Sequence, residues 1–115
     1  MTEALESADA NINPSPSTTA SLAVDRCKDA WTLAHQQAKR SNKGIYEVDA
    51  IATQAYCGTL PTLCGAENIR NFIACVAHGV AVGIIDGACA SRLLYAAQVA
   101  KSALSLLSAA KQKAG

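Results

Sequence analysis

The amino-acid sequence predicts an all-α protein: a compact four-helix bundle-like domain with a buried Ala/Gly-rich central helix and a long C-terminal helix. Half of the residues are hydrophobic and alanine supplies many of them, and alanine has the highest helix propensity of any residue. Apolar residues recur at helical spacing in several segments, whereas no segment of useful length alternates apolar and polar residues as a strand does. The length of 115 residues suits one domain.

Residues 1–20 are expected to form a disordered polar tail, and residues 21–115 a single helical domain. The tail carries Pro14 and Pro16 in a cluster of Ser, Thr and Asn residues. It offers too little apolar area to offset the entropy that is lost when a chain is ordered. It also lacks the basic and apolar regions of a secretory signal, so no export is predicted.

The first helix is predicted to run from an N-cap at Ser21 to about Arg40, with Gly44 placed to terminate it. Trp31 is its main anchor. Its apolar residues share one face at spacings of three and four, namely Val24, Cys27, Ala30, Trp31, Ala34 and Ala38. A second, short helix is predicted over residues 46–57, and a connecting loop follows it.

The central helix is predicted from about Ala66 to Gly83. It includes most of the stretch 72–85, fourteen residues that carry no formal charge when His78 is neutral. That stretch would span about 21 Å as a helix, and a membrane crossing needs roughly 20 residues. A short helix that is apolar nearly all round is normally enclosed by its own domain, so no membrane partner is expected.

Asp86 is a good N-cap for a long last helix over residues 87–111. A heptad-like seam runs along this helix and consists of Ala90, Leu93, Ala97, Ala100, Leu104 and Leu107. Two interpretations of the seam are possible. Either it packs against the chain's own helices, or its later part pairs with a second copy of the chain. Under the second interpretation, the candidate interface residues are Tyr95, Gln98, Ala100, Leu104 and Leu107.

Three cysteines and a histidine are candidate zinc ligands: Cys57, Cys64, Cys75 and His78. Their spacing matches no compact zinc knuckle, and free cysteine commonly acts as a small buried hydrophobe. The five cysteines are an odd number spread through predicted helices, which favours reduced thiols in the cytoplasm over a disulfide framework. We therefore predict no metal and no cofactor.

Catalytic constellations are not apparent in the sequence. Cys75 and His78 lie in the most apolar run of the chain, where a thiolate would be disfavoured, and His35 is on another helix. The glycines are dispersed and form no phosphate-binding loop, and the carboxylates are spread out. The protein is therefore not expected to be an enzyme.

The net charge of +1 argues against a strongly basic nucleic-acid binder. Residues 18–115 carry ten basic groups and six acidic ones, which is a mild excess. The residues available for a weak phosphate contact are Lys39, Arg40, Lys43 and Arg92. A small cluster of this kind at a helix C-terminus more often complements the helix dipole and stays solvated.

Three segments carry a resemblance: Glu67–Gly79, Gly83–Asp86 and Leu93–Ala100. Together they make a helix, a break containing Gly-Ile-Ile-Asp and a helix containing Leu-Leu-Tyr-Ala-Ala. This pattern covers about a third of the chain and resembles the C-terminal half of short uncharacterised bacterial helical proteins. The resemblance implies a bacterial cytosolic setting and no catalytic activity.

These observations lead to an expected function of non-enzymatic interaction or regulation. The module would act through an apolar helix surface on a protein partner or on a second copy of itself. An alternative is a weakly basic DNA-associated accessory protein that uses the four basic residues named above. A minor alternative is a structural zinc protein that uses the four Cys and His candidates.

Overall fold

The computed structural model describes residues 16–114, with side chains from residue 18 to residue 107. Its elements are four helices, namely α2 (Pro16–Arg40), α3 (Ile45–Gly58), α4 (Ala66–Ala81) and α5 (Gly87–Ala114), and no strand occurs within this range. The predicted all-α class with four helices is confirmed. The first helix begins at Pro16, so residues 16–20 are helical and not part of a tail as predicted. The remainder of the predicted tail, residues 1–15, lies outside the described residues.

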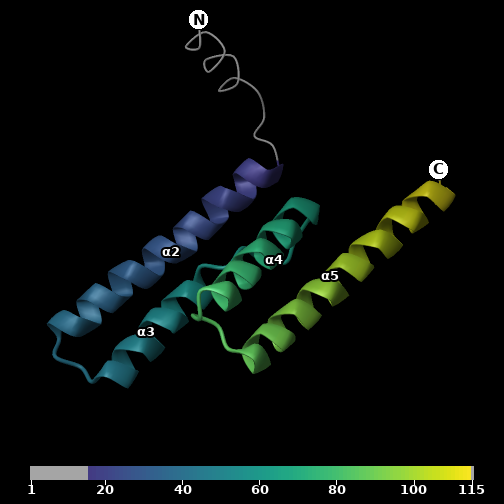
Figure 1. Cartoon of the computed structure of the whole chain (residues 1–115). Helices are drawn as coiled ribbons and strands as arrows, with labels where there is room; N and C mark the ends of the chain where they lie inside the picture. Colours follow the sequence, from purple (N-terminus) through teal and green to yellow (C-terminus); the bar gives the residue numbers. More distant parts are fainter. Residues whose placement is uncertain (1–15, 115) are drawn as a thin grey trace, which may run out of the picture.

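The long helix α2 supports two shorter helices along its length. At 1.5 Å per residue its 25 residues span about 37 Å, whereas α3 spans about 21 Å and α4 about 24 Å. Both α3 and α4 pack against α2, with α3 along its C-terminal half and α4 along its N-terminal half (Figure 1). As a result α3 and α4 follow one another along the same helix.

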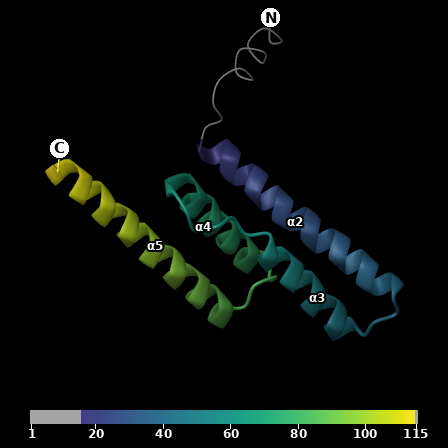
Figure 2. The same ribbon diagram turned by 180° about the vertical axis from the view of Figure 1, so that it is seen from behind.

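The last helix, α5, lies at the edge of the fold. It runs antiparallel to α4, on the side of α4 that faces away from α2 (Figure 2). Among the described helices, the Cα atoms of α5 come within 8 Å of α4 and of no other helix. The molecule therefore measures 59 × 45 × 20 Å, its smallest extent being about two helix diameters. In this broad shape the central helix is less enclosed than predicted, since Ile73 and Val80 of α4 are exposed.

Local residues account for the helix ends. Asn42 adopts a left-handed conformation (φ 60°) after α2, a conformation that Asn tolerates better than most residues. Asn42 therefore has the helix-terminating role that was predicted for Gly44. At the start of α5 the Asp86 carboxylate accepts a hydrogen bond from the Cys89 backbone N–H at 2.7 Å, so the predicted N-cap is confirmed.

Tyr56 of α3 is the central side chain of the core. It is fully buried, and its hydroxyl donates a hydrogen bond of 2.7 Å to the Cys75 carbonyl of α4. The backbones of α3 and α4 do not come within 8 Å of each other at any Cα pair. The tyrosine side chain therefore connects two helices whose backbones are not in close contact.

Gly79 of α4 lies where the chain turns back toward the core. The backbone N–H groups of Ile84 and Ile85 both donate to the Gly79 carbonyl, at 2.8 and 3.1 Å. Gly83 permits this turn because it adopts a positive φ of 83°. The Ile85 side chain is thereby buried in the space that Gly79 leaves open beside the Tyr56 ring.

The buried thiols resist ionisation. Burial, with a smaller contribution from the neighbouring Cys75, raises the pKa of the Cys27 thiol from 9.0 to about 12. Burial also raises the pKa of the Cys57 and Cys75 thiols and of the Tyr56 hydroxyl. The folded state therefore excludes thiolates that the unfolded chain forms freely at alkaline pH.

We predict that Gly79→Ala destabilises the protein by about 1–2 kcal/mol, although alanine favours a helix. The added Cβ would lie 2.6 Å from Ile85 Cδ1 and 3.2 Å from Tyr56 Cε1. Chemical unfolding measures the change. Gly87→Ala is the control, because no atom lies within 4 Å of its added Cβ, and it should change stability by less than about 0.5 kcal/mol. An equal effect at both positions would contradict the packing described for Gly79.

Alkaline pH should weaken the fold under reducing conditions. The pKa of Cys27 in the folded state exceeds its ordinary value of 9.0, so its contribution to stability is complete below about pH 9 and declines from there toward pH 12. The decline for one such thiol approaches about 1.4 kcal/mol per pH unit. Urea unfolding between pH 7 and pH 10.5 measures it. Cys27→Ala should make the decline shallower, and an unchanged slope would contradict this assignment.

Candidate interaction surface

Helix α5 has two apolar faces, and only one of them packs against the rest of the protein. The inner face buries Ala90 and Ala97 in the core, with Leu93 packed against it. The other face carries three large exposed residues, which we call the outer stripe: Tyr95 (71% exposed), Val99 (50%) and Leu106 (72%). Leu107 (64% exposed) lies nearer to the side of the helix that carries Leu104. Single exposed apolar residues are ordinary on a protein surface, but a row of three large ones along one helix is typical of a binding surface.

Part of the outer stripe lies where α5 extends past α4. The first two turns of α4 line a hollow together with Lys101, Leu104 and Ser105 of α5. Since the two helices are antiparallel, the residues of α5 after Ser105 continue beyond the start of α4, and the C-terminal end of α5 projects there (Figure 1). Leu106 and Leu107 are on this projecting part.

The structure divides the five predicted interface residues between the two faces of α5. Tyr95, Gln98 and Leu107 are exposed, whereas Ala100 and Leu104 are half-buried. Leu104 lines the hollow beside Ile69 and Ile73 of α4, so it belongs to the inner face. Val99 and Leu106 are outer-stripe residues that the sequence prediction missed. The signal for them was the spacing of Tyr95, Val99 and Leu106 at four and seven positions, which places the three side chains on one face of a helix.

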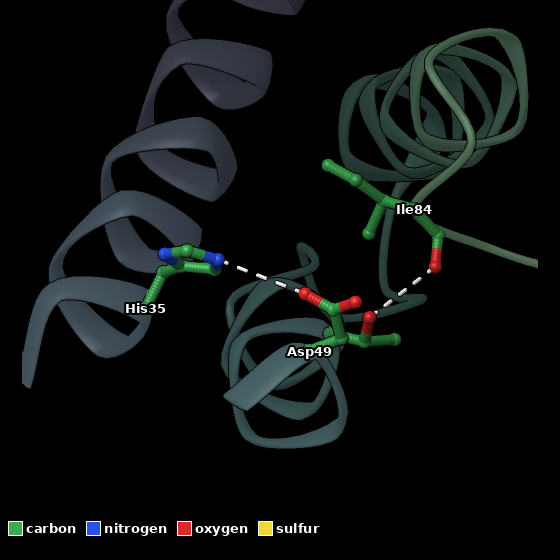
Figure 3. Close-up of polar contacts among 4 residues, drawn as sticks. His35, Asp49 and Ile84 are labelled. Atoms are coloured by element: carbon green, nitrogen blue, oxygen red, sulfur yellow. Dashed lines mark hydrogen bonds and ion pairs between the residues drawn. The ribbon is translucent and has the colours of Figure 1, made fainter. Parts of the chain in front are cut away.

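A second candidate site is an open hollow of about 500 Å³ between the C-terminal part of α2 and the start of α3. Its residues are His35, Lys39, Asn42, Lys43, Ile45, Val48 and Asp49. The His35 ring stacks on Trp31 with 4.6 Å between ring centroids. The Nε2 atom of His35 lies 3.6 Å from the Asp49 carboxylate (Figure 3). The sequence did not reveal this His–Asp contact, because the two residues come from different helices.

The chemistry of this hollow is limited. His35 and Asp49 are residue types that can act together as a general base. However, the described residues that line the hollow include no serine, threonine or cysteine that such a base would activate as a nucleophile. Lys43 is also 3.9 Å from Glu47, so its charge is partly balanced. The hollow is therefore a weaker candidate than the outer stripe.

The basic residues of the DNA-binding alternative do not all lie together. Lys39 and Lys43 line the hollow next to the exposed Arg40. Arg92 belongs to α5, whose Cα atoms come within 8 Å of neither α2 nor α3 in the part of the chain that the structure describes. The structure therefore brings three of the four predicted basic residues to one corner and leaves the fourth on another helix.

The four candidate zinc ligands also differ in their surroundings. Cys75 is fully buried, Cys64 is exposed, and His78 lines a shallow hollow against α2. Within residues 16–114, no three Cys, His, Asp or Glu side chains are grouped so that they could hold a metal ion.

Comparison of the chain with protein families, with characterised proteins and with solved structures finds no match. None of the helices in the described range has both the length and the apolar character needed to span a membrane.

The two faces of α5 should respond differently to truncation. Leu104→Ala is expected to destabilise the protein by about 2 kcal/mol, because it removes a half-buried side chain next to Ile69 and Ile73. Leu106→Ala removes the same atoms from an exposed position and should cost less than about 0.5 kcal/mol. Thermal or urea unfolding of the two variants tests the assignment. A larger loss of stability for Leu106→Ala than for Leu104→Ala would contradict the assignment of Leu104 to the inner face and Leu106 to the outer face.

Proposed function

We propose that the protein is a small non-enzymatic interaction module that binds a protein partner through the outer stripe of α5. The observation that carries the proposal is that, among the described helices, α4 alone has Cα atoms within 8 Å of α5, while Tyr95, Val99, Leu106 and Leu107 remain exposed. Burying these side chains against a partner would contribute about 25 cal/mol for each Å² of apolar surface removed from water. Tyr95 is also of a residue type that is enriched at binding hot spots.

A second copy of the chain is the partner that we propose. An isologous dimer brings the same surface of two protomers together, so one exposed stripe supplies both sides of the interface. The projecting end of α5 supports this arrangement, because a second helix can approach Leu106 and Leu107 there without meeting α4. The setting that we propose is the bacterial cytoplasm, in keeping with the resemblance of residues 67–100 and with five free cysteines.

Native mass spectrometry and sedimentation of the full chain test this function. We expect a dimer for the natural sequence, and we expect Leu106→Asp to weaken association at least tenfold, since a charge would be buried at the interface. Ser105→Asp is the matched control: it introduces the same charge at the neighbouring exposed position outside the stripe. Circular dichroism checks that both variants remain helical.

Two outcomes would contradict the proposal. One is a natural protein that stays monomeric at concentrations well above those at which such interfaces form. The other is association that Leu106→Asp leaves unchanged but that weakens steeply with salt in the presence of DNA, since phosphate contacts depend strongly on salt. That second result would favour the basic corner formed by Lys39, Arg40 and Lys43.

A further inference from the structure

The hollow between α2 and α3 has the size of a small-molecule site. Its volume is about 500 Å³, and ligand pockets typically measure about 300–1,000 Å³. The described residues that line it belong to the C-terminal part of α2, the turn that follows and the start of α3. The hollow is therefore separate from α5 and independent of the proposed dimer interface.

The turn after α2 places two lysines at this hollow. The Asn42 backbone N–H donates to the Lys39 carbonyl at 3.1 Å, and the Lys43 backbone N–H donates to the Ala38 carbonyl at 3.4 Å. With Asn42 at a positive φ of 60°, these two bonds make a Schellman motif, which folds the chain back over the last turn of a helix. Lys39 and Lys43 consequently line the same hollow, although Lys43 lies beyond the end of α2.

The two lysines differ in how far their charges are neutralised. The Lys43 ammonium lies 3.9 Å from the Glu47 carboxylate, and both side chains are exposed, so this ion pair is weak. Lys39 has no carboxylate within 4 Å in the part of the chain that the structure describes. An ammonium group that lines a hollow and has no ion partner is available to a carboxylate of a ligand.

Asp49 limits the negative charge that the hollow accepts. Its carboxylate points toward the His35 ring, whose Nε2 is 3.6 Å away (Figure 3). With His35 neutral, Lys39 and Lys43 contribute two positive charges to the lining and Asp49 one negative charge, which leaves a net charge of +1. This balance favours a ligand with one negative charge over a phosphomonoester, which carries about −1.5 to −2.

Another part of the lining is apolar. Ile45 and Val48 both line the hollow; Val48 is buried, whereas Ile45 is 73% exposed. A ligand with an apolar body would remove the Ile45 side chain from water, and this transfer favours binding. A bare inorganic anion would make no use of this surface and would leave most of the hollow unfilled.

We propose that this hollow is a binding site for a small organic acid that has one carboxylate group and an apolar body, as a medium-chain fatty acid has. The carboxylate accepts a hydrogen bond from the Lys39 ammonium, and the apolar body lies against Ile45 and Val48. Lys43 adds a second, partly neutralised positive charge on the same side.

Tryptophan fluorescence provides the test, with octanoate as the probe. Trp31 is the only tryptophan in the sequence, and it stacks on His35, which lines the hollow. Titration of the full-length protein with octanoate should give a saturable change in fluorescence, and isothermal titration calorimetry should give the same dissociation constant. 1-Octanol has the apolar body without the charge and should bind about tenfold more weakly. Acetate has the charge without the body and should bind at least about tenfold more weakly.

Matched variants test the two parts of the site. Lys39→Gln should weaken octanoate binding about tenfold, whereas Lys28→Gln, at an exposed position of α2 outside the hollow, should leave it unchanged. Ile45→Ser should weaken binding about fivefold, whereas Leu33→Ser, also exposed and outside the hollow, should not. All four positions are on the surface, and circular dichroism checks that the variants remain helical. Leu106→Asp should bind octanoate as the natural protein does, so failure of the dimer would leave this proposal standing.

Several results would overturn the proposal. One is 1-octanol binding as tightly as octanoate, since the site would then be apolar only. Another is inorganic phosphate or acetate matching octanoate, which would make the hollow a simple anion site. Equal binding by Lys39→Gln and Lys28→Gln would place the ligand elsewhere. Binding of an oligonucleotide by the natural protein, lost in Lys39→Gln and without any binding of octanoate, would assign the corner to nucleic acid instead.

Discussion

The contact between Tyr56, Gly79 and Ile85 connects α3, α4 and the turn that leads into α5. Tyr56 joins α3 to the Cys75 carbonyl of α4, and Gly79 leaves the space into which Ile85 folds. Ile85 belongs to the turn that leads into α5, so its position determines where the last helix begins. The absence of a side chain at Gly79 therefore determines how α4 is positioned relative to α3 and to α5. This explains why a glycine is placed in the middle of an otherwise strong helix-forming segment.

Much of the fold was predictable from local sequence. The helical spacing of apolar residues identified all four helices, and Asp86 marked the start of α5 because its capping geometry depends only on nearby backbone. Packing between helices was less predictable. The sequence suggested that α4 is enclosed, yet α3 and α4 share the length of α2 and α5 covers one remaining side. The early start of α2 was also missed, because Pro16 is compatible with the first turn of a helix as well as with a tail.

The candidate surface was predictable only in part, for a geometric reason. Helix α5 carries two apolar stripes of similar strength, and nothing local determines which of them faces α4. Leu104 and Leu106 differ by two positions, which places them on different sides of a helix, and only the tertiary structure distinguishes the inner residue from the outer one. The contact between His35 and Asp49 was missed for the same reason, since it joins residues from different helices.

The edge position of α5 has a further consequence for how the fold opens. Helices α2, α3 and α4 hold one another through several surfaces, but α5 is retained by a single face and by the turn at Gly83. Sub-global opening proceeds through the unit with the fewest cooperative contacts, which here is the last helix. An opened α5 could take the equivalent place on a neighbouring molecule and recover every contact that it had left. The same architecture thus supports exchange of a terminal helix between chains, in which the covalent connection at Gly83 acts as the hinge.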